Sequence, residues 1–164
     1  PAAEYASSCW LPTSWTPLKL LAKTEHNHDT TLYDFKLPNG TSLNLPVCAC
    51  ILLRAPGRGR KEGGGPADFD PGADAVRPYT PVSDDAATGK FTLMVKRYAG
   101  GAVSEYLHGL PVGTPVDFRH IAFNIKEQYP FEGKRRITML AGGTGITPMY
   151  QALQKLMGTP GDKR

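Results

Sequence analysis

Short runs in which apolar and polar residues alternate dominate the chain and predict β-strands. In residues 31–36, Tyr33 and Phe35 lie on one face of the expected strand, and Asp34 and Lys36 lie on the other. This period of two is the pattern of a half-buried strand. Comparable runs predict five further strands, at residues 18–25, 47–54, 76–83, 91–98 and 115–121. Six short strands with intervening turns favour a mainly β fold, a six-stranded antiparallel Greek-key barrel.

Two other segments have helical spacing. Residues 102–109 predict one short helix, because Val103, Tyr106 and Leu107 fall on one face. Near the end of the chain, residues 136–141 predict an apolar strand that leads through a glycine turn into a second helix. In that helix, Thr147 is the expected N-cap, Pro148 the first helical residue and Gly158 the stop.

The apolar face expected for this second helix has four members: Tyr150, Leu153, Leu156 and Met157. A strand, a glycine turn and a helix are the first half of a βαβ unit. No second parallel strand follows in the sequence, so we expect the start of a truncated α/β nucleotide-binding domain.

These elements divide the chain into three parts. Residues 1–16 form an N-terminal arm that docks through Cys9–Leu11 and Trp15, residues 17–131 form the barrel, and residues 132–164 begin the α/β domain. Within the barrel, residues 55–75 are rich in glycine, proline and charge. They contain little apolar surface to offset the entropy of ordering. We expect a mobile insertion there and assign it no site.

Composition and charge narrow the function. Of 164 residues, 40% are hydrophobic and 21% are charged, as in an ordinary soluble domain. The net charge of +4 suits an acidic protein partner or an anionic cofactor but does not indicate a nucleic-acid binder. No apolar run approaches the roughly 18 residues of a membrane span. Membrane association is therefore expected only through segments outside this sequence.

Histidines and cysteines give no metal-binding pattern. His26 and His28 belong to a predicted turn with no third ligand nearby, so we expect no metal site. Cys48 and Cys50 are expected as buried free thiols on one face of the 47–54 strand, because a disulfide between such close neighbours has poor geometry. Free thiols fit a reducing compartment.

The stretch 77–83 carries the strongest candidate chemistry. Arg77 and Tyr79 should share one face of an extended segment, with Thr80 on the other. A guanidinium matches phosphate oxygens and a tyrosine ring offers a stacking surface. Pro78 stiffens the backbone between them. The pattern predicts a site for an anionic ligand with a planar ring, although a plain surface strand would have the same residues.

Two glycine segments could bind further phosphate. Gly100 and Gly101 precede the first helix, where free N–H groups and the Ser104 hydroxyl favour an anion. Gly142-Gly143-Thr144-Gly145 follows the predicted last strand and could contact a nucleotide, but it is not a G-x-G-x-x-G fingerprint. Each segment alone is also compatible with an ordinary turn.

Taken in order, four motifs resemble the NADH–cytochrome b5 reductase family, within the ferredoxin–NADP reductase-like flavoproteins. They are R-P-Y-T-P at 77–81, M-V-K-x-Y at 94–98, G-G-x-x-S-x-Y-L at 100–107 and G-G-T-G-I-T-P-M at 142–149. The resemblance covers about residues 17–158. It implies a FAD-binding barrel followed by an NADH-binding α/β domain, with NADH as co-substrate of the complete protein.

The resemblance also implies roles for individual residues. Arg77 would pair with FAD phosphate, Pro78 and Tyr79 would lie against the flavin or ribityl, and Thr80, the catalytic candidate, would contact the isoalloxazine near N5. The other cofactor-binding residues implied are Met94, Lys96 and Tyr98 beside the flavin; Gly101, Ala102, Val103 and Ser104 at the pyrophosphate; Thr147 near the flavin; and Gly142, Gly143, Thr144 and Gly145 at the start of the NADH site.

The sequence departs from the family pattern in three places. Ala102-Val103 replaces a more usual Lys-Met, so pyrophosphate binding there would be mostly by backbone. His120-Ile121 stands where many relatives have Gly-Pro, on the adenine side. The C-terminal half of the family, including its Cys-Gly-Pro segment, is not in this sequence. We therefore expect a FAD-domain portion that does not itself turn over NADH.

The expected function is transfer of a hydride from NADH to FAD and of single electrons to a haem protein such as cytochrome b5. The resemblance further implies a monomer on the cytoplasmic face of the endoplasmic reticulum or mitochondrial membrane. Two alternatives are the flavin domain of a nitrate reductase or oxygenase reductase, and a non-catalytic β-barrel interaction module.

Overall fold

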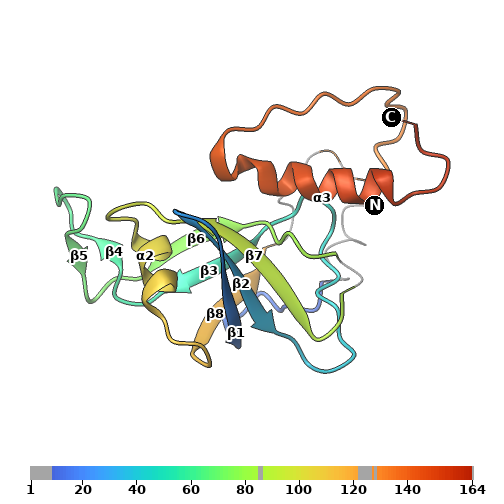
Figure 1. The fold of residues 1–164 in the computed structure, drawn as a ribbon. Helices are drawn as coiled ribbons and strands as arrows, with labels where there is room; N and C mark the ends of the chain where they lie inside the picture. Colours follow the sequence, from blue (N-terminus) through green and yellow to red (C-terminus); the bar gives the residue numbers. More distant parts are fainter. Residues whose placement is uncertain (1–8, 85–86, 122–126, 128, 164) are drawn as a thin grey trace.

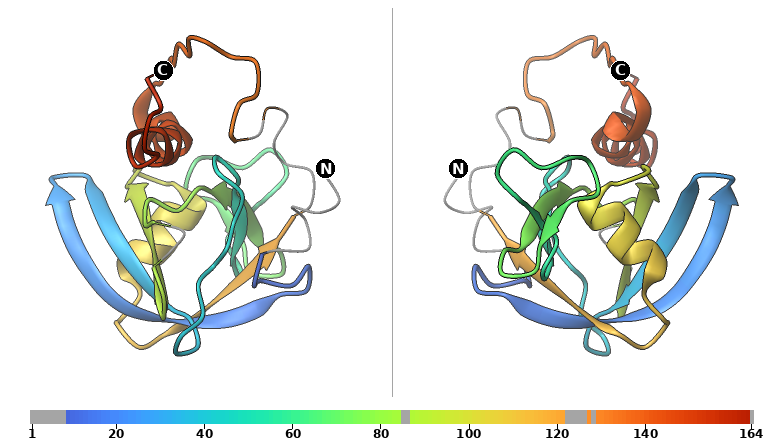
Figure 2. Two further views of the ribbon diagram at one scale, coloured as in Figure 1. Left: turned by 90° about the vertical axis from the view of Figure 1, so that its right-hand side faces the viewer. Right: turned by 90° about the vertical axis from the view of Figure 1, so that its left-hand side faces the viewer.

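The computed structural model of the chain describes residues 9–84, 87–121, 127 and 129–163. Six strands form one antiparallel sheet in the order β6–β3–β8–β1–β2–β7, which curls into a barrel (Figures 1 and 2). Their bounds are β1 Thr16–Asn27, β2 Thr30–Lys36, β3 Ile51–Ala55, β6 Ala75–Tyr79, β7 Lys90–Lys96 and β8 Pro115–His120. The last strand, β8, lies between β1 and β3, as in a Greek key. The predicted fold class is confirmed.

The two edge strands, β6 and β7, meet where the chain leaves β6. The Val82 N–H donates to the Thr92 carbonyl at 2.8 Å. The Thr92 N–H in turn donates to the Ser83 Oγ at 3.1 Å. These two bonds join the extension of β6 to β7 and bring the edges of the sheet together.

Three phenylalanines fill the barrel interior. Phe35, Phe91 and Phe118 come from β2, β7 and β8, and each is at most 1% exposed. Their ring centroids are 4.7 to 5.5 Å apart, with two of the three pairs edge to face. The predicted alternation in β2 is confirmed, because Tyr33 is buried on the same face as Phe35.

One predicted strand begins later than expected. Residues 47–50 are not part of β3, because the backbone turns at Cys48, which has a φ of 68°. The Ala49 N–H donates to the Pro46 carbonyl at 2.9 Å within this turn. Cys48 and Cys50 form no disulfide within the described chain, but they are half-buried and precede β3, so the prediction that both thiols are buried on one strand face is wrong. An apolar run does not reveal a left-handed residue.

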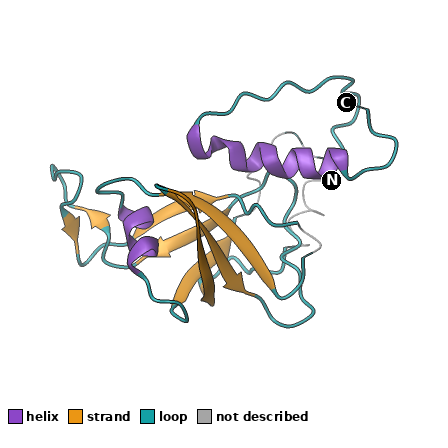
Figure 3. Cartoon of the chain, viewed as in Figure 1, coloured by secondary structure: helices purple, strands orange, loops and turns teal. Residues whose placement is uncertain are grey.

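The first helix, α2 (Ala102–Gly109), is confirmed with Val103 and Leu107 buried against the barrel. The segment 55–75, expected to be mobile, contains two short strands (Figure 3). Strands β4 (Gly59–Arg60) and β5 (Phe69–Asp70) pair as a small hairpin. The Arg58 guanidinium lies 5.2 Å from the centroid of the Phe69 ring. This segment has few apolar residues and forms no core of its own. A cation–aromatic contact and hydrogen bonds in its turns hold it together instead.

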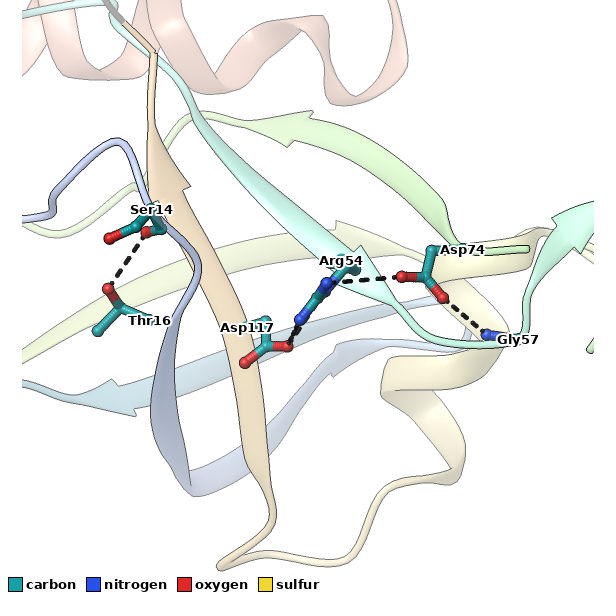
Figure 4. Close-up of polar contacts among 6 residues, drawn as sticks. All are labelled: Ser14, Thr16, Arg54, Gly57, Asp74 and Asp117. Atoms are coloured by element: carbon teal, nitrogen blue, oxygen red, sulfur yellow. Dashed lines mark hydrogen bonds and ion pairs between the residues drawn. The ribbon is translucent and has the colours of Figure 1, made fainter. Parts of the chain in front are cut away.

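An ion-pair network fixes the base of that hairpin (Figure 4). Arg54 on β3 donates from Nε to Asp117 on β8 at 3.1 Å. Its Nη1 lies 3.6 Å from Asp74 Oδ2. Asp74 also accepts from the Gly57 N–H at 3.2 Å. Both ends of the 56–74 segment are therefore tied to the barrel.

The C-terminal segment forms a 3₁₀ turn, η1 (Gly143–Gly145), and the helix α3 (Ile146–Met157). Residues 136–141 are not a strand, because no described strand lies beside them to complete a hydrogen-bonded ladder. The N-cap is Gly145, and the Thr147 hydroxyl donates to the Thr144 carbonyl at 3.1 Å instead. Pro148 is thus the third helical residue. Gly158 is the C-cap, as predicted.

The buried face of α3 differs from the predicted one. The side chains that pack are Thr147, Gln151, Ala152 and Leu156. Three of the four predicted apolar positions, Tyr150, Leu153 and Met157, are exposed. The helix also makes a polar contact with the turn before β3, where the Cys48 N–H donates to Gln151 Oε1 at 2.8 Å. None of the helices described is long and apolar enough to cross a bilayer.

The arm docks where predicted, although its residues 1–8 lie outside the described part. Leu11 is buried, and the Trp10 N–H donates to the Leu43 carbonyl at 2.9 Å. The Trp15 ring lies between two guanidinium groups, those of Arg54 at 4.9 Å and Arg119 at 4.6 Å.

We predict that Phe118→Ala lowers the free energy of unfolding by about 3–5 kcal/mol, the range for truncating a core phenylalanine. The half-buried Phe69 of the hairpin is the control, and Phe69→Ala should cost less. Urea unfolding of both variants measures the difference. Equal losses would show that the hairpin is as integral to the core as β8.

His120 should make stability depend on pH. Burial lowers the pKa of this imidazole, so the unfolded chain binds the proton more readily than the folded one. Stability should therefore fall as the pH drops through the unfolded pKa of about 6.5 towards the lower folded value. Thermal unfolding at pH 7.5 and 5.5 should show a smaller pH effect in His120→Asn than in the wild type. An unchanged pH effect would contradict this.

Candidate functional site

A cleft of about 460 Å³ opens at one end of the barrel, between β6, β7 and the start of α2. Strand β6 contributes Arg77, Pro78 and Tyr79, and β7 with the residues after it contributes Lys96 and Tyr98. We call it the cationic cleft, after the three basic side chains that line it, Arg60, Arg77 and Lys96. It brings together residues that lie about twenty positions apart in the sequence.

The β6 side chains differ in burial. Arg77 is exposed, and in the described chain the only hydrogen bond of its side chain runs from Nη1 to the adjacent Val76 carbonyl at 2.8 Å. Tyr79 packs against the core, and burial raises the pKa of its hydroxyl to about 12. A tyrosine with its ordinary pKa of about 10 is already neutral at physiological pH, and burial extends this to more alkaline pH. Strand alternation places the guanidinium and the ring in the same cleft.

The β7 side carries a cation that is already engaged. Lys96 Nζ lies 2.8 Å from Asp29 Oδ2. Hydrogen bonding between the two raises the pKa of Lys96 and lowers that of Asp29, so both stay charged. Tyr98 is 51% exposed, and its ring centroid lies 5.9 Å from the same Nζ. The Tyr98 ring is thus accessible at the cleft, beside the Lys96 ammonium, whose charge is partly offset by Asp29.

The start of α2 offers backbone donors. The N–H groups of Ala102, Val103 and Ser104 have no acceptor in the described chain, and Gly101 provides no side-chain cap. All four residues line the cleft. Unsatisfied N–H groups and the helix dipole make such a terminus an anion site.

Two contacts hold that helix start in place. The Ser104 Oγ accepts from the Tyr98 N–H at 3.2 Å, which leaves its hydroxyl hydrogen free to donate. Glu105 would repel an anion, but Arg97 binds both its oxygens at 3.1 and 3.0 Å. That pairing lowers the pKa of Glu105. The Glu105 carboxylate therefore stays ionised, and the positive charge of Arg97 offsets its negative charge.

A second cleft of about 410 Å³ lies between the barrel and α3. Two predicted site residues, Met94 and Thr147, line it together with Leu32, Val82, Ile146 and Tyr150. We call it the apolar cleft. Thr144 lines the cationic cleft and Ile146 the apolar one, so η1 passes from one to the other.

Four predicted residues line neither cleft. Thr80 is buried at the end of β6, between Tyr79 of the cationic cleft and Val82 of the apolar one. Gly142, Gly143 and Gly145 are exposed in the turn before α3. Only Thr144 of that turn reaches the cationic cleft.

Arg60 is the residue that sequence analysis missed. It comes from the hairpin of the 55–75 segment and lines the cationic cleft. Its position depends on the folding of the hairpin against α2, a long-range contact without a local pattern. His26 and Thr92 were likewise not expected at the apolar cleft.

The two clefts together suit one kind of ligand. Guanidinium groups and a helix start bind phosphate, and Tyr79 with the apolar cleft can accommodate a flat ring. No group of three metal-ligating side chains occurs in the part of the chain that the structure describes.

Comparison with known proteins identifies the family. A profile described as "Oxidoreductase FAD-binding domain" matches residues 66–122. NADH-cytochrome b5 reductase 2 of Mycosarcoma maydis is 35% identical over 139 residues, or 84% of this chain and 37% of that protein. The Neurospora crassa protein of the same name is 36% identical over 152 residues, or 91% of this chain and 40% of that protein. The chain belongs to the NADH–cytochrome b5 reductase family.

A solved structure of the family agrees with the fold. The cytochrome b5 reductase domain of Ulva prolifera nitrate reductase superposes with a TM-score of 0.71 at 30% identity, covering 92% of this chain and 60% of that one. The chain spans less than half the length of the two curated reductases described above.

Gly101 is where the helix start tolerates no side chain. A Cβ there would lie 2.4 Å from the Ser104 Oγ and 2.9 Å from the Tyr98 carbonyl oxygen. We expect Gly101→Ala to lower the free energy of unfolding by about 1–3 kcal/mol, as for other forced contacts. Gly109→Ala, at the open end of the same helix, is the control, since a Cβ there meets nothing within 4 Å. Chemical denaturation would contradict the argument if both variants matched the wild type.

Proposed function

We propose that this chain is the FAD-binding part of an NADH-dependent oxidoreductase that delivers electrons to a haem protein. The observation that carries the proposal is the convergence of Arg77, Tyr79 and the start of α2 on one cleft. Membership of the NADH–cytochrome b5 reductase family and the match to an FAD-binding profile support it.

The residues present fit FAD. The diphosphate would be held by the Arg77 guanidinium and by the free N–H groups of Ala102, Val103 and Ser104. Among the residues that the structure describes, no acidic side chain lines the cationic cleft. We assign the stacking surface to Tyr79 and Tyr98, with Pro78 and Lys96 beside them.

The flavin ring would extend towards the apolar cleft, where Met94 and Thr147 would line it. Thr80 keeps the catalytic role inferred from the family, a contact near N5, because it lies between residues of the two clefts. Gly142, Gly143, Thr144 and Gly145 would begin the NADH site.

When bound, FAD would accept a hydride from NADH and release electrons singly to the acceptor. The chain itself supplies position and electrostatics. Tyr79 stays protonated, so it offers a neutral face and no competing negative charge. Apolar side chains from Leu32, Val82 and Ile146 exclude water beside the expected ring.

A cytochrome b5-like haem protein is the acceptor we propose, because the curated relatives carry that name. We also propose that the chain acts as a monomer. A non-catalytic interaction module is not favoured, since the family match covers the barrel and both clefts.

We predict that Arg77→Ala weakens FAD binding by about 1–3 kcal/mol, the cost of losing a charged hydrogen bond. The measurement is a titration of apoprotein with FAD, in which quenching of the flavin fluorescence reports binding. Lys36→Ala is the matched control, because Lys36 is also an exposed cation but lies far from the cleft. It is at one end of β2, whereas Thr30, which pairs with Lys96 of the cleft, is at the other end.

The control variant should bind FAD as the wild type does. If the wild type takes up no FAD, the proposed function is wrong. If it binds FAD and Arg77→Ala binds equally well, the cationic cleft is not the diphosphate site.

A further inference from the structure

The hairpin of strands β4 and β5 reaches over the start of α2. Figure 1 shows it beside that helix, away from the rest of the barrel. The contact is close, because a Cβ built on Gly100 would lie 3.1 Å from the Pro66 carbonyl oxygen. The charge of Arg58 also helps to lower the pKa of Glu105 in the first turn of α2. The hairpin thus forms one wall of the cationic cleft.

Hydrogen bonds and ion pairs hold the base of this wall. The ion pairs of Arg54 hold its base, as described above. The Gly59 N–H donates to the Ala73 carbonyl at 2.7 Å, and the Lys61 N–H donates to the Asp68 carbonyl at 3.3 Å. Arg60 lies between these two bonded positions, so the backbone that carries it is constrained from both sides.

The Arg60 side chain has no polar partner among the described residues. It is exposed and lines the cleft, and it makes no hydrogen bond or ion pair there, although the backbone of Arg60 pairs with Phe69 in the hairpin. Its neighbour Lys61 is different, since Nζ lies 2.8 Å from Asp68 Oδ1. Among the three basic side chains of the cleft, Lys96 is engaged by Asp29. Neither Arg60 nor Arg77 forms an ion pair with a carboxylate in the part of the chain that the structure describes.

A positively charged side chain near the start of α2 would help this site to bind an anion. Ala102 and Val103 present no cationic side chain, although their N–H groups point into an anion site. A diphosphate carries two negative charges, and a guanidinium fork matches two of its oxygens.

We propose that Arg60 binds the diphosphate of FAD, so that the hairpin provides a second guanidinium opposite Arg77. This inference rests on the proposed function. It gives the 55–75 segment a binding role and makes the hairpin part of the cofactor site. The contact requires phosphate, so it should favour FAD over riboflavin.

The test compares Arg60→Ala with Lys61→Ala, by titrating each apoprotein and the wild type with FAD and with riboflavin. The two variants remove one positive charge each from adjacent hairpin positions, so a long-range effect of net charge would be similar. We expect Arg60→Ala to weaken FAD binding about tenfold or more, the range for a charged hydrogen bond. Riboflavin binding by Arg60→Ala should equal that of the wild type, and Lys61→Ala should change FAD binding less than twofold.

Arg60→Lys adds a second arm, because it keeps the charge but loses the fork and should recover only part of the affinity. Equal FAD binding by Arg60→Ala and wild type overturns the proposal and leaves the FAD function intact. Equal weakening by both alanine variants, or equal weakening for riboflavin, also overturns it. A wild type that binds neither ligand overturns the proposed function as well.

Discussion

The cationic cleft exists only because the two edges of the sheet meet. Its walls are β6, with Arg77 and Tyr79, and β7, with Lys96, and these strands are the first and last in the sheet order. The hydrogen bond from Val82 to Thr92 joins them, and Ser83 accepts a second bond. Antiparallel pairing through four intervening strands would otherwise leave the guanidinium and the ammonium on opposite edges of an open sheet. Closure of the barrel therefore assembles the site.

Electrostatics inside the cleft depend on internal pairing. Asp29 engages Lys96, and Arg97 engages Glu105, so one cation and one anion near the site are partly cancelled. What remains is a guanidinium on β6, another on the hairpin and the free N–H groups of α2. Desolvation acts separately, because burial raises the pKa of Tyr79 still further above physiological pH.

Much of the fold follows from short-range patterns. The alternation in β2, the spacing of Val103 and Leu107 in α2, and the Arg77–Tyr79 pair on one strand face were all predictable, because each depends on local geometry. The features that were not predictable depend on distant partners or on single backbone angles. The positive φ of Cys48 shortens β3, and no described strand lies beside residues 136–141. In α3, Tyr150, Leu153 and Met157 are exposed although their spacing predicted burial. Arg60 reaches the site through tertiary contacts alone.

The Arg54 network has a consequence for how a ligand could leave. Each strand of the hairpin contributes only two paired residues. An isolated two-stranded ribbon is only marginally stable in water. Its base, however, is held to β3 and β8 by ion pairs. Local opening should therefore begin at the tip and stop at Asp74, without disturbing the barrel. Amide protons of the tip would then exchange with solvent before those of β3, and cofactor release would follow a hinged opening of one wall of the cleft.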